Sequence, residues 1–376
     1  MTLEIVRTGG EPMTHVPPSQ RYIVFDAVRG LAVLLAMVDH VKVQFVPDFH
    51  LLLPFTRLST PSFIIVFGVM IELAYLSKLR AGAPISQARR RIAIRMVQCL
   101  SVFAVITLAA MVSGNLGLAE GARALAGLGP GRFSEILMIY ALLFSVVLVL
   151  LPLFVRYGAY LVLGLAALGW GLKGIAAGSL DATVPYVLTF FTGIGTGYGP
   201  ALLPAMTFLA FGLALGEVMT ARRRKVLPAI LVMLAALILS HELSNGVMDA
   251  GRRFIAHRWT NHPGYFAFGI LGFSAISLFL MMVQRTPYLK HLTAGLARAG
   301  KQSLFIYGGG NLVLNLLPAF EITRAAGAGL AFGFMMALFG AAFIRTRRPA
   351  CQHPSSQIRG ARFQQHFLNF TKPKRA

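Results

Sequence analysis

An arginine and a histidine eleven positions apart stand within an otherwise mostly apolar stretch, RYIVFDAVRGLAVLLAMVDHVKVQFV (residues 21–46). A helix would place Arg29 and His40 on nearly one face, roughly 16 Å apart along its axis. Ionisable groups in a membrane-length apolar helix are costly and are candidates for a functional site. A guanidinium suits an anionic ligand, and a neutral imidazole can take a proton near neutral pH. The spacing therefore indicates an elongated anionic substrate lying along this helix.

Two acidic residues could pair with Arg29 and so reduce the cost of burying its charge. Asp26 precedes it by three positions, so the two side chains can pair on one helix face. Glu72 lies six residues before Lys78 in the next apolar stretch, which returns across the membrane, and it should reach the depth of Arg29. We therefore expect a cluster of Asp26, Arg29 and Glu72. Such a cluster could simply lock two helices together, or Arg29 could also face the anion of a ligand.

His40 on its own allows two interpretations. A single histidine near a helix end is often a satisfied polar residue, and with its neighbours it becomes a candidate general base. Asp39 lies about 100° further round a regular helix, so it should not orient the His40 ring. We take His40, Arg29 and Asp26 as the candidate catalytic residues.

Further polar groups could bind the two ends of a substrate. The segment ARRRIAIR (88–95) carries a topology signal, and its guanidinium groups also suit the phosphates of a nucleotide. The loop at 241–263 contains polar groups and a tryptophan that could form a weak platform for a sugar, although such loops are also simple connectors. Its histidines lack compact metal-ligand spacing, so we expect no metal site. The residues concerned are Arg89, Arg90, Arg91 and Arg95, and then His241, Trp259 and His262.

Composition identifies the class of protein. The chain is 56% hydrophobic and only 13% charged, with a mean hydropathy of +0.69. Soluble domains contain about a quarter charged residues, so we expect an all-α, polytopic membrane protein. Its two cysteines cannot build a disulfide framework, and neither has a partner at metal-site spacing.

The hydropathy pattern predicts ten membrane-spanning helices within a domain covering 22–345. Disordered tails are expected at 1–21 and 346–376, and a re-entrant segment could lie at 178–200. The predicted spans are about 23–46, 55–77, 92–112, 134–155, 157–176, 201–219, 226–240, 264–283, 302–319 and 325–344.

The distribution of basic residues supports one orientation of these spans. With the N-terminus inside, the cytoplasmic segments hold 25 Lys and Arg residues and the external loops hold seven. This asymmetry follows the positive-inside rule and predicts that both termini are cytoplasmic. It also accounts for most of the net charge of +22, so no nucleic-acid partner is expected.

The first span resembles that of the acyltransferase-3 family and the wider superfamily of ten-span acyl transferases, which includes periplasmic glucan-modifying and glucosaminide acetyltransferase-like members. The shared pattern is a basic residue, Asp, Arg-Gly-Leu-Ala and then His, here Arg21, Asp26, Arg29–Ala32 and His40. Weaker matches are TPSFIIVFGVMIEL (60–73), ARRRIAIR (88–95), NHPGYFAFGILG (261–272) and GKQSLFIY (300–307). The family's last signature often leads into a histidine, whereas here GGGN follows and ends at Asn311.

This resemblance implies an acyl-CoA-dependent O-acyltransferase in the bacterial cytoplasmic membrane. The donor would be cytoplasmic acetyl-CoA or succinyl-CoA, and the acceptor a hydroxyl of an extracytoplasmic glycan or polysaccharide. Arg29 would hold the donor and His40 would deprotonate the hydroxyl, with a transient acyl-histidine as the alternative mechanism. Two other classes stay open: a transporter or flippase of an envelope precursor, and a non-catalytic subunit of an envelope complex.

Overall fold

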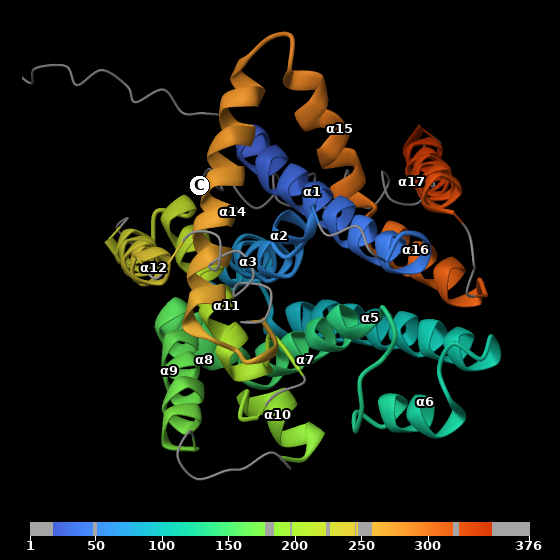
Figure 1. The fold of residues 1–376 in the computed structure, drawn as a ribbon. Coiled ribbons are helices and arrows are strands. Elements are labelled where there is room, and N and C mark those ends of the chain that lie inside the picture. Colours follow the sequence, from blue (N-terminus) through green and yellow to red (C-terminus); the bar gives the residue numbers. More distant parts are fainter. Residues whose placement is uncertain are drawn as a thin grey trace, which may run out of the picture.

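The computed structural model describes residues 18–47, 51–176, 184–195, 198–222, 226–244, 246, 258–318 and 323–347. These residues form helices joined by turns, with no strand among them, as predicted (Figure 1). The predicted tails lie almost wholly outside the described ranges. The first helix begins at Pro18 and the last ends at Arg347, each slightly inside a predicted tail.

The helices differ widely in length. In chain order they are α1 (Pro18–Phe45), α2 (Leu53–Thr56), α3 (Ser59–Ile71), the π-helical turn η1 (Glu72–Leu76), α4 (Ser77–Arg80), α5 (Ile85–Val112), α6 (Leu118–Leu125), α7 (Glu135–Val149), α8 (Leu151–Tyr157), α9 (Ala159–Ala176), α10 (Tyr186–Thr192), α11 (Leu202–Met219), α12 (Val226–Ser244), α14 (Pro263–Arg285), α15 (Lys290–Lys301), α16 (Ser303–Leu316) and α17 (Arg324–Arg347). Part of the segment predicted as re-entrant is the short helix α10, and 177–183 and 196–197 lie outside the described residues.

Seven helices in the described part of the chain are long and apolar enough to cross a membrane. There are eight if α7 and α8, which meet at an angle of 78°, form one broken span. The break reflects Pro152 in the first turn of α8, because proline cannot continue the helix before it. The other two predicted spans correspond to α1, which carries several charges, and to α16, which has only 14 residues. The structure thus supports a multi-pass membrane protein, and the count of ten stays a prediction.

The helix α1 runs through the centre of the upper half of the molecule (Figure 1). It packs chiefly against α15 and α3, and also against α16, α14 and α17. Below it in this view, α3 packs on α11 and α11 on α9, while α5 lies beside α7. A helix that is surrounded in this way can carry polar side chains into enclosed space, because its neighbours rather than lipid surround them.

Two glycines allow α1 and α15 to cross backbone to backbone. A Cβ atom added at Gly30 would overlap the carbonyl oxygen of Leu296, and one added at Gly300 would overlap the carbonyl oxygen of Asp26. Small residues at such crossings are typical of helix pairs in membranes. This crossing fixes the start of α1, and therefore Arg29, against the end of α15.

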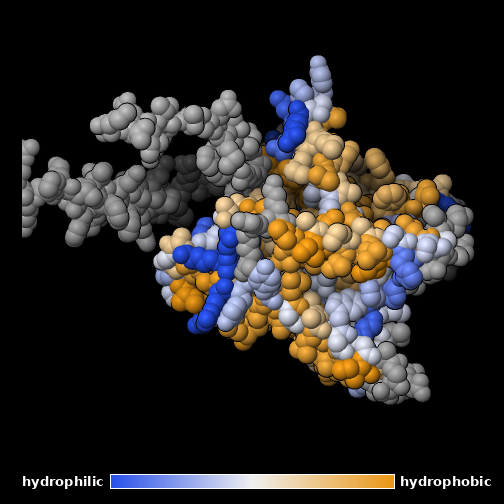
Figure 2. Space-filling model, turned by 90° about the vertical axis from the view of Figure 1, so that its left-hand side faces the viewer, coloured by the Kyte–Doolittle hydropathy of each residue, from blue (hydrophilic) through white to orange (hydrophobic). Residues whose placement is uncertain are grey.

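The molecular surface agrees with a membrane environment. Figure 2 shows one face on which apolar residues cover a broad area and hydrophilic residues gather towards the margins. Large apolar side chains such as Met233, Leu234 and Leu237 of α12 are exposed on the outside of the protein. In water such a surface would be unfavourable, whereas lipid acyl chains would cover it.

Candidate active site: two cavities along α1

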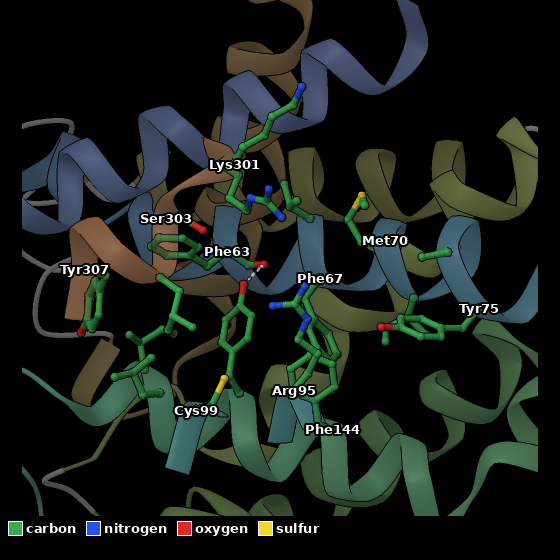
Figure 3. Close-up of a pocket in the computed structure, with 18 residues that line it drawn as sticks. Phe63, Phe67, Met70, Tyr75, Arg95, Cys99, Phe144, Lys301, Ser303 and Tyr307 are labelled. Atoms are coloured by element: carbon green, nitrogen blue, oxygen red, sulfur yellow. Dashed lines mark hydrogen bonds between the residues drawn. The ribbon is translucent and has the colours of Figure 1, made fainter. Parts of the chain in front are cut away.

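The first cavity, which we call the Arg29 cavity, has a volume of about 360 Å³ and lies among α1, α3, α5, α7 and α16 (Figure 3). Three cationic side chains line it, namely Arg29, Arg95 and Lys301. Aromatic and apolar side chains form the remaining walls, among them Phe63 and Phe67 from α3 and Tyr307 from α16. A cavity with cations and a long apolar floor fits a ligand that combines an anion with an uncharged chain.

Arg29 is held in place from two sides. Its Nη2 donates to Asp26 Oδ1 at 3.0 Å, so the pair expected from the spacing forms. Its Nε donates to the carbonyl oxygen of Gly300 at 2.7 Å, across the glycine crossing of α1 and α15. These two bonds use part of the guanidinium fork, and the side chain still lines the cavity. The fork is therefore oriented by the fold before a ligand arrives.

The second cavity, which we call the His40 cavity, has a volume of about 310 Å³ and is much more polar. Its lining includes His40 and both partners of an ion pair, Asp39 and Arg57, whose charged atoms are 3.4 Å apart. Further charged and hydroxyl groups that line it are Arg132, Glu135, Arg258, Ser59 and Thr60, and its rings are Phe133, Trp259, Phe63 and Tyr307.

Asn311 fixes the His40 ring. The Nδ1 atom of His40 lies 2.7 Å from Oδ1 of Asn311. An amide oxygen can only accept, so in the neutral ring Nδ1 carries the proton and Nε2 keeps its lone pair. Phe133 stacks on the imidazole at 4.7 Å between ring centroids, and Tyr307 meets it edge-on at 5.6 Å. His40 is thus arranged as a proton acceptor in a fixed orientation.

Phe133, which stacks on His40, has an unusual backbone conformation. Its φ of 58° lies in the left-handed region, which a bulky residue rarely adopts. Such conformations cost about 1–3 kcal/mol and persist where the surrounding structure imposes them. The neighbouring Arg132 covers the Phe133 ring at 5.0 Å and is tied to α1 through Gln44.

The two cavities share one wall. Phe63, Ile136 and Tyr307 line both of them, so these side chains lie between the cationic space and the polar one. Phe63 and Tyr307 meet edge-on, with ring centroids 6.4 Å apart. Tyr140 donates from its hydroxyl to the carbonyl oxygen of Phe63 at 2.8 Å, the dashed bond in Figure 3. A chain that reached from Arg29 to His40 would have to pass this wall.

Glu72 does not join the cluster predicted for it. It pairs instead with Arg80, whose Nη2 lies 3.0 Å from Oε2, and it also accepts from Thr220 Oγ1 at 3.3 Å. The prediction placed Glu72 by depth and ignored its direction around the helix. Met70 and Ala74 line the Arg29 cavity, and Glu72 lies two positions from each, on the opposite face towards α11. Glu72 therefore locks two helices and does not serve Arg29.

Of the four predicted phosphate-binding arginines, one lines either of these two cavities. Arg95 lines the Arg29 cavity together with Cys99, one turn further along α5. Arg89, Arg90 and Arg91 are exposed near the start of α5 and do not line it. Lys301, the second residue of the GKQSLFIY motif, supplies a cation that was not predicted as a site residue.

The three residues predicted to bind an acceptor do not lie at one site. Trp259 lines the His40 cavity, whereas His241 and His262 do not. His262 caps α14, because its Nδ1 accepts from the backbone N–H of Gly264 at 3.2 Å. Burial lowers the pKa of His262, which favours the neutral ring that this bond requires. His241 lies near the end of α12.

Asn311 is the principal site residue that residue types and spacing did not predict. It lies 271 positions from His40, so no local pattern could pair them. The available signal was that Asn311 ends the GGGN segment, where the family signature leads into a histidine. Arg132 and Arg258 were likewise not predicted as site residues, since they were assigned to external loops.

No family model matches this chain, and no curated protein matches it. The function is therefore proposed from the geometry of the two cavities and from the sequence resemblance of the first span.

Proposed function

We propose that this protein is an integral membrane O-acyltransferase that moves an acyl group from acyl-CoA to a hydroxyl of a glycan on the other side of the membrane. The observation that carries the proposal is the pair of cavities on α1. One is cationic and contains Arg29, the other contains His40 with its Nδ1 held by Asn311, and Phe63, Ile136 and Tyr307 line both.

The Arg29 cavity has the chemistry that acyl-CoA requires. Coenzyme A carries phosphates at one end and a long uncharged chain ending in a thioester. Arg29, Arg95 and Lys301 would bind anionic or polar groups, and the apolar floor along α3 would hold the chain. Arg95 and Lys301 also line a neighbouring groove with Arg345, so the cationic surface continues beyond the cavity. Acetyl-CoA and succinyl-CoA are the donors that we propose to test.

The reaction would occur where the two cavities meet. The Nε2 of His40 takes the proton of the acceptor hydroxyl, and the oxygen attacks the thioester carbonyl carbon. The bond from that carbon to sulfur breaks, and the CoA thiolate leaves and takes up a proton. Asn311 keeps the proton of the free imidazole on Nδ1, so Nε2 stays available. An acyl-histidine would use the same Nε2 as a nucleophile instead.

A binding and turnover experiment tests this proposal. Purified protein in lipid nanodiscs is titrated with acetyl-CoA and with succinyl-CoA by calorimetry, and CoA release is followed with a glycan acceptor present. Lys301→Gln should weaken donor binding by about 10-fold or more, because one charge-assisted contact is lost. His40→Ala should bind the donor normally, but its turnover should fall by about 100-fold or more, because the base is absent.

Matched variants provide the controls. His291 is an exposed histidine of α15 and lines neither cavity, so His291→Ala should leave binding and turnover unchanged. A His40→Ala protein with normal turnover would show that the histidine is structural and would refute the mechanism. If purified protein neither binds nor turns over any acyl-CoA, yet carries a glycan precursor across vesicles, a flippase would replace the transferase.

A further inference from the structure

The His40 cavity contains more positive charge than its own carboxylates neutralise. Among the described residues that line it, three are arginines and two are acidic, Asp39 and Glu135. Arg57 pairs with Asp39 at 3.4 Å, and Arg258 lies 3.9 Å from Glu135. Within the described part of the chain Arg132 has no carboxylate partner, and its side chain donates to the amide oxygen of Gln44 and covers the Phe133 ring. One cation therefore has no acidic counterpart in this cavity.

Two N–H groups of these arginines lack an acceptor in the described part of the chain. The Nε of Arg57 and the Nη1 of Arg132 are buried and have no hydrogen-bond partner among the residues that the structure describes. Leaving a buried donor without a partner costs about 1–3 kcal/mol, and more when it is charged. Buried groups of this kind therefore call for a ligand or an ion. Both donors belong to side chains that line the same cavity as His40.

The rest of the lining is suited to a sugar. Trp259 offers an aromatic face covered on one side by Arg258 at 5.1 Å, and Ser59 and Thr60 add hydroxyl groups. A volume of about 310 Å³ is at the lower end of the range for small-molecule sites, which suits one ring rather than a long oligosaccharide. Aromatic faces, hydroxyl groups and unpaired guanidinium donors together recognise a sugar that carries an anion.

From this geometry we propose that the His40 cavity is an anion-binding subsite, in which Arg57 and Arg132 bind a carboxylate carried by the substrate beside His40. This inference rests on the proposed function, because it describes the partner that meets the thioester there. The carboxylate belongs either to an acidic sugar of the acceptor or to a dicarboxylic acyl chain. The two guanidinium groups would donate their free Nε–H and Nη1–H to its oxygens.

Saturation-transfer NMR on the full-length protein in nanodiscs tests the subsite without any acyl-CoA. The probes are D-glucuronate with D-glucose, and succinate with its neutral diamide, so each pair differs chiefly in charge. At least one anion should give several-fold more saturation transfer than its neutral counterpart. Signals from glucuronate alone place the anion on the acceptor, and signals from succinate alone place it on the acyl chain.

Arg132→Gln is the most informative variant, because it removes the cation that has no carboxylate partner and leaves no acid unpaired. It should reduce the anion signal several-fold. Arg123→Gln is the matched control, since Arg123 is exposed on α6 and lines neither cavity, and it should leave the signal unchanged. If Arg132→Gln does not fold, Arg57→Lys takes its place, because it keeps the charge towards Asp39 but loses the Nε–H donor.

Equal signals from charged and neutral probes, no signal from any probe, or full binding by the arginine variants would overturn the subsite. These outcomes test the subsite independently of the proposed acyltransferase activity. Anion binding without acyl transfer would leave the subsite in place and remove the transferase, whereas transfer without anion binding would do the reverse.

Discussion

The hydrogen bond between His40 and Asn311 gives the sharpest prediction. Replacing Asn311 with leucine keeps a side chain of similar size in a fully buried position but removes the acceptor for Nδ1–H. A buried donor without a partner costs about 1–3 kcal/mol. The tautomer with its proton on Nε2 then becomes the favoured one, and this tautomer cannot act as the base.

The expected size of the effect follows from that energy. A bias of about 1–3 kcal/mol corresponds to roughly 5- to 150-fold between the two tautomers. We therefore expect Asn311→Leu to lower kcat for acyl transfer by about 10- to 100-fold. That loss should not exceed the loss in His40→Ala, because removing the base entirely is the larger change. KM for acyl-CoA should hardly change, since Asn311 does not line the Arg29 cavity.

Steady-state kinetics of the wild type, the two single variants and the double variant would test this reasoning. In the double variant Asn311→Leu/His40→Ala, kcat should be no lower than in His40→Ala alone, because Asn311 acts only through His40. Asn315→Ala is the matched control, as this buried asparagine lies one turn along α16 and bonds to the carbonyl oxygens of Arg132 and Asn311. Additive losses in the double variant, or a normal kcat in Asn311→Leu, would refute the positioning role.

Three further predictions concern the fold. Gly30→Ala should prevent the α1–α15 crossing and sharply reduce the yield of folded protein in detergent, whereas Gly171→Ala, with no atom within 4 Å of its added Cβ, should behave like the wild type. Arg80→Met should lower the free energy of unfolding by about 3–5 kcal/mol, because it leaves the fully buried Glu72 unpaired. Glu72→Gln should lower the free energy of unfolding by less, since the Arg80 side chain that loses its partner is partly exposed. Thermal unfolding that ranks the two variants in the opposite order would contradict this. A reporter fused at residue 250 should read as external and one at the C-terminus as internal, and an internal reading at 250 would contradict the ten-span topology.

Much of the fold could be predicted from hydropathy, because membrane-spanning helices carry long apolar segments. The helical class and the pairing of Asp26 with Arg29 both depend on local spacing, and both agree with the structure. The prediction for Glu72, which was wrong, shows the limit of such reasoning. Counting residues predicts depth in a membrane, but the direction of a side chain depends on which neighbouring helix packs against it. The packing of α3 on α11 was not visible in the sequence.

The contact between His40 and Asn311 could not be predicted for a related reason. It depends on α16 lying beside α1, although the two helices are separated by most of the chain. The sequence showed that Asn311 stood near the end of a signature, and nothing in it indicated which residue Asn311 would contact. A site assembled from distant helices becomes visible only when their packing is known.

The arginines of the His40 cavity illustrate a different limit. In the charge count, Arg132 and Arg258 are two external cations, and Arg57 is a charge within a span. That count averages over whole loops, so it cannot separate a solvated arginine from a buried one. Binding depends on the individual group. A cation whose N–H groups are all paired has little left to offer a ligand, whereas Arg57 and Arg132 each keep one buried donor beside the proposed base. The chemistry of this cavity therefore follows from how completely each arginine is satisfied, and the number of arginines does not determine it.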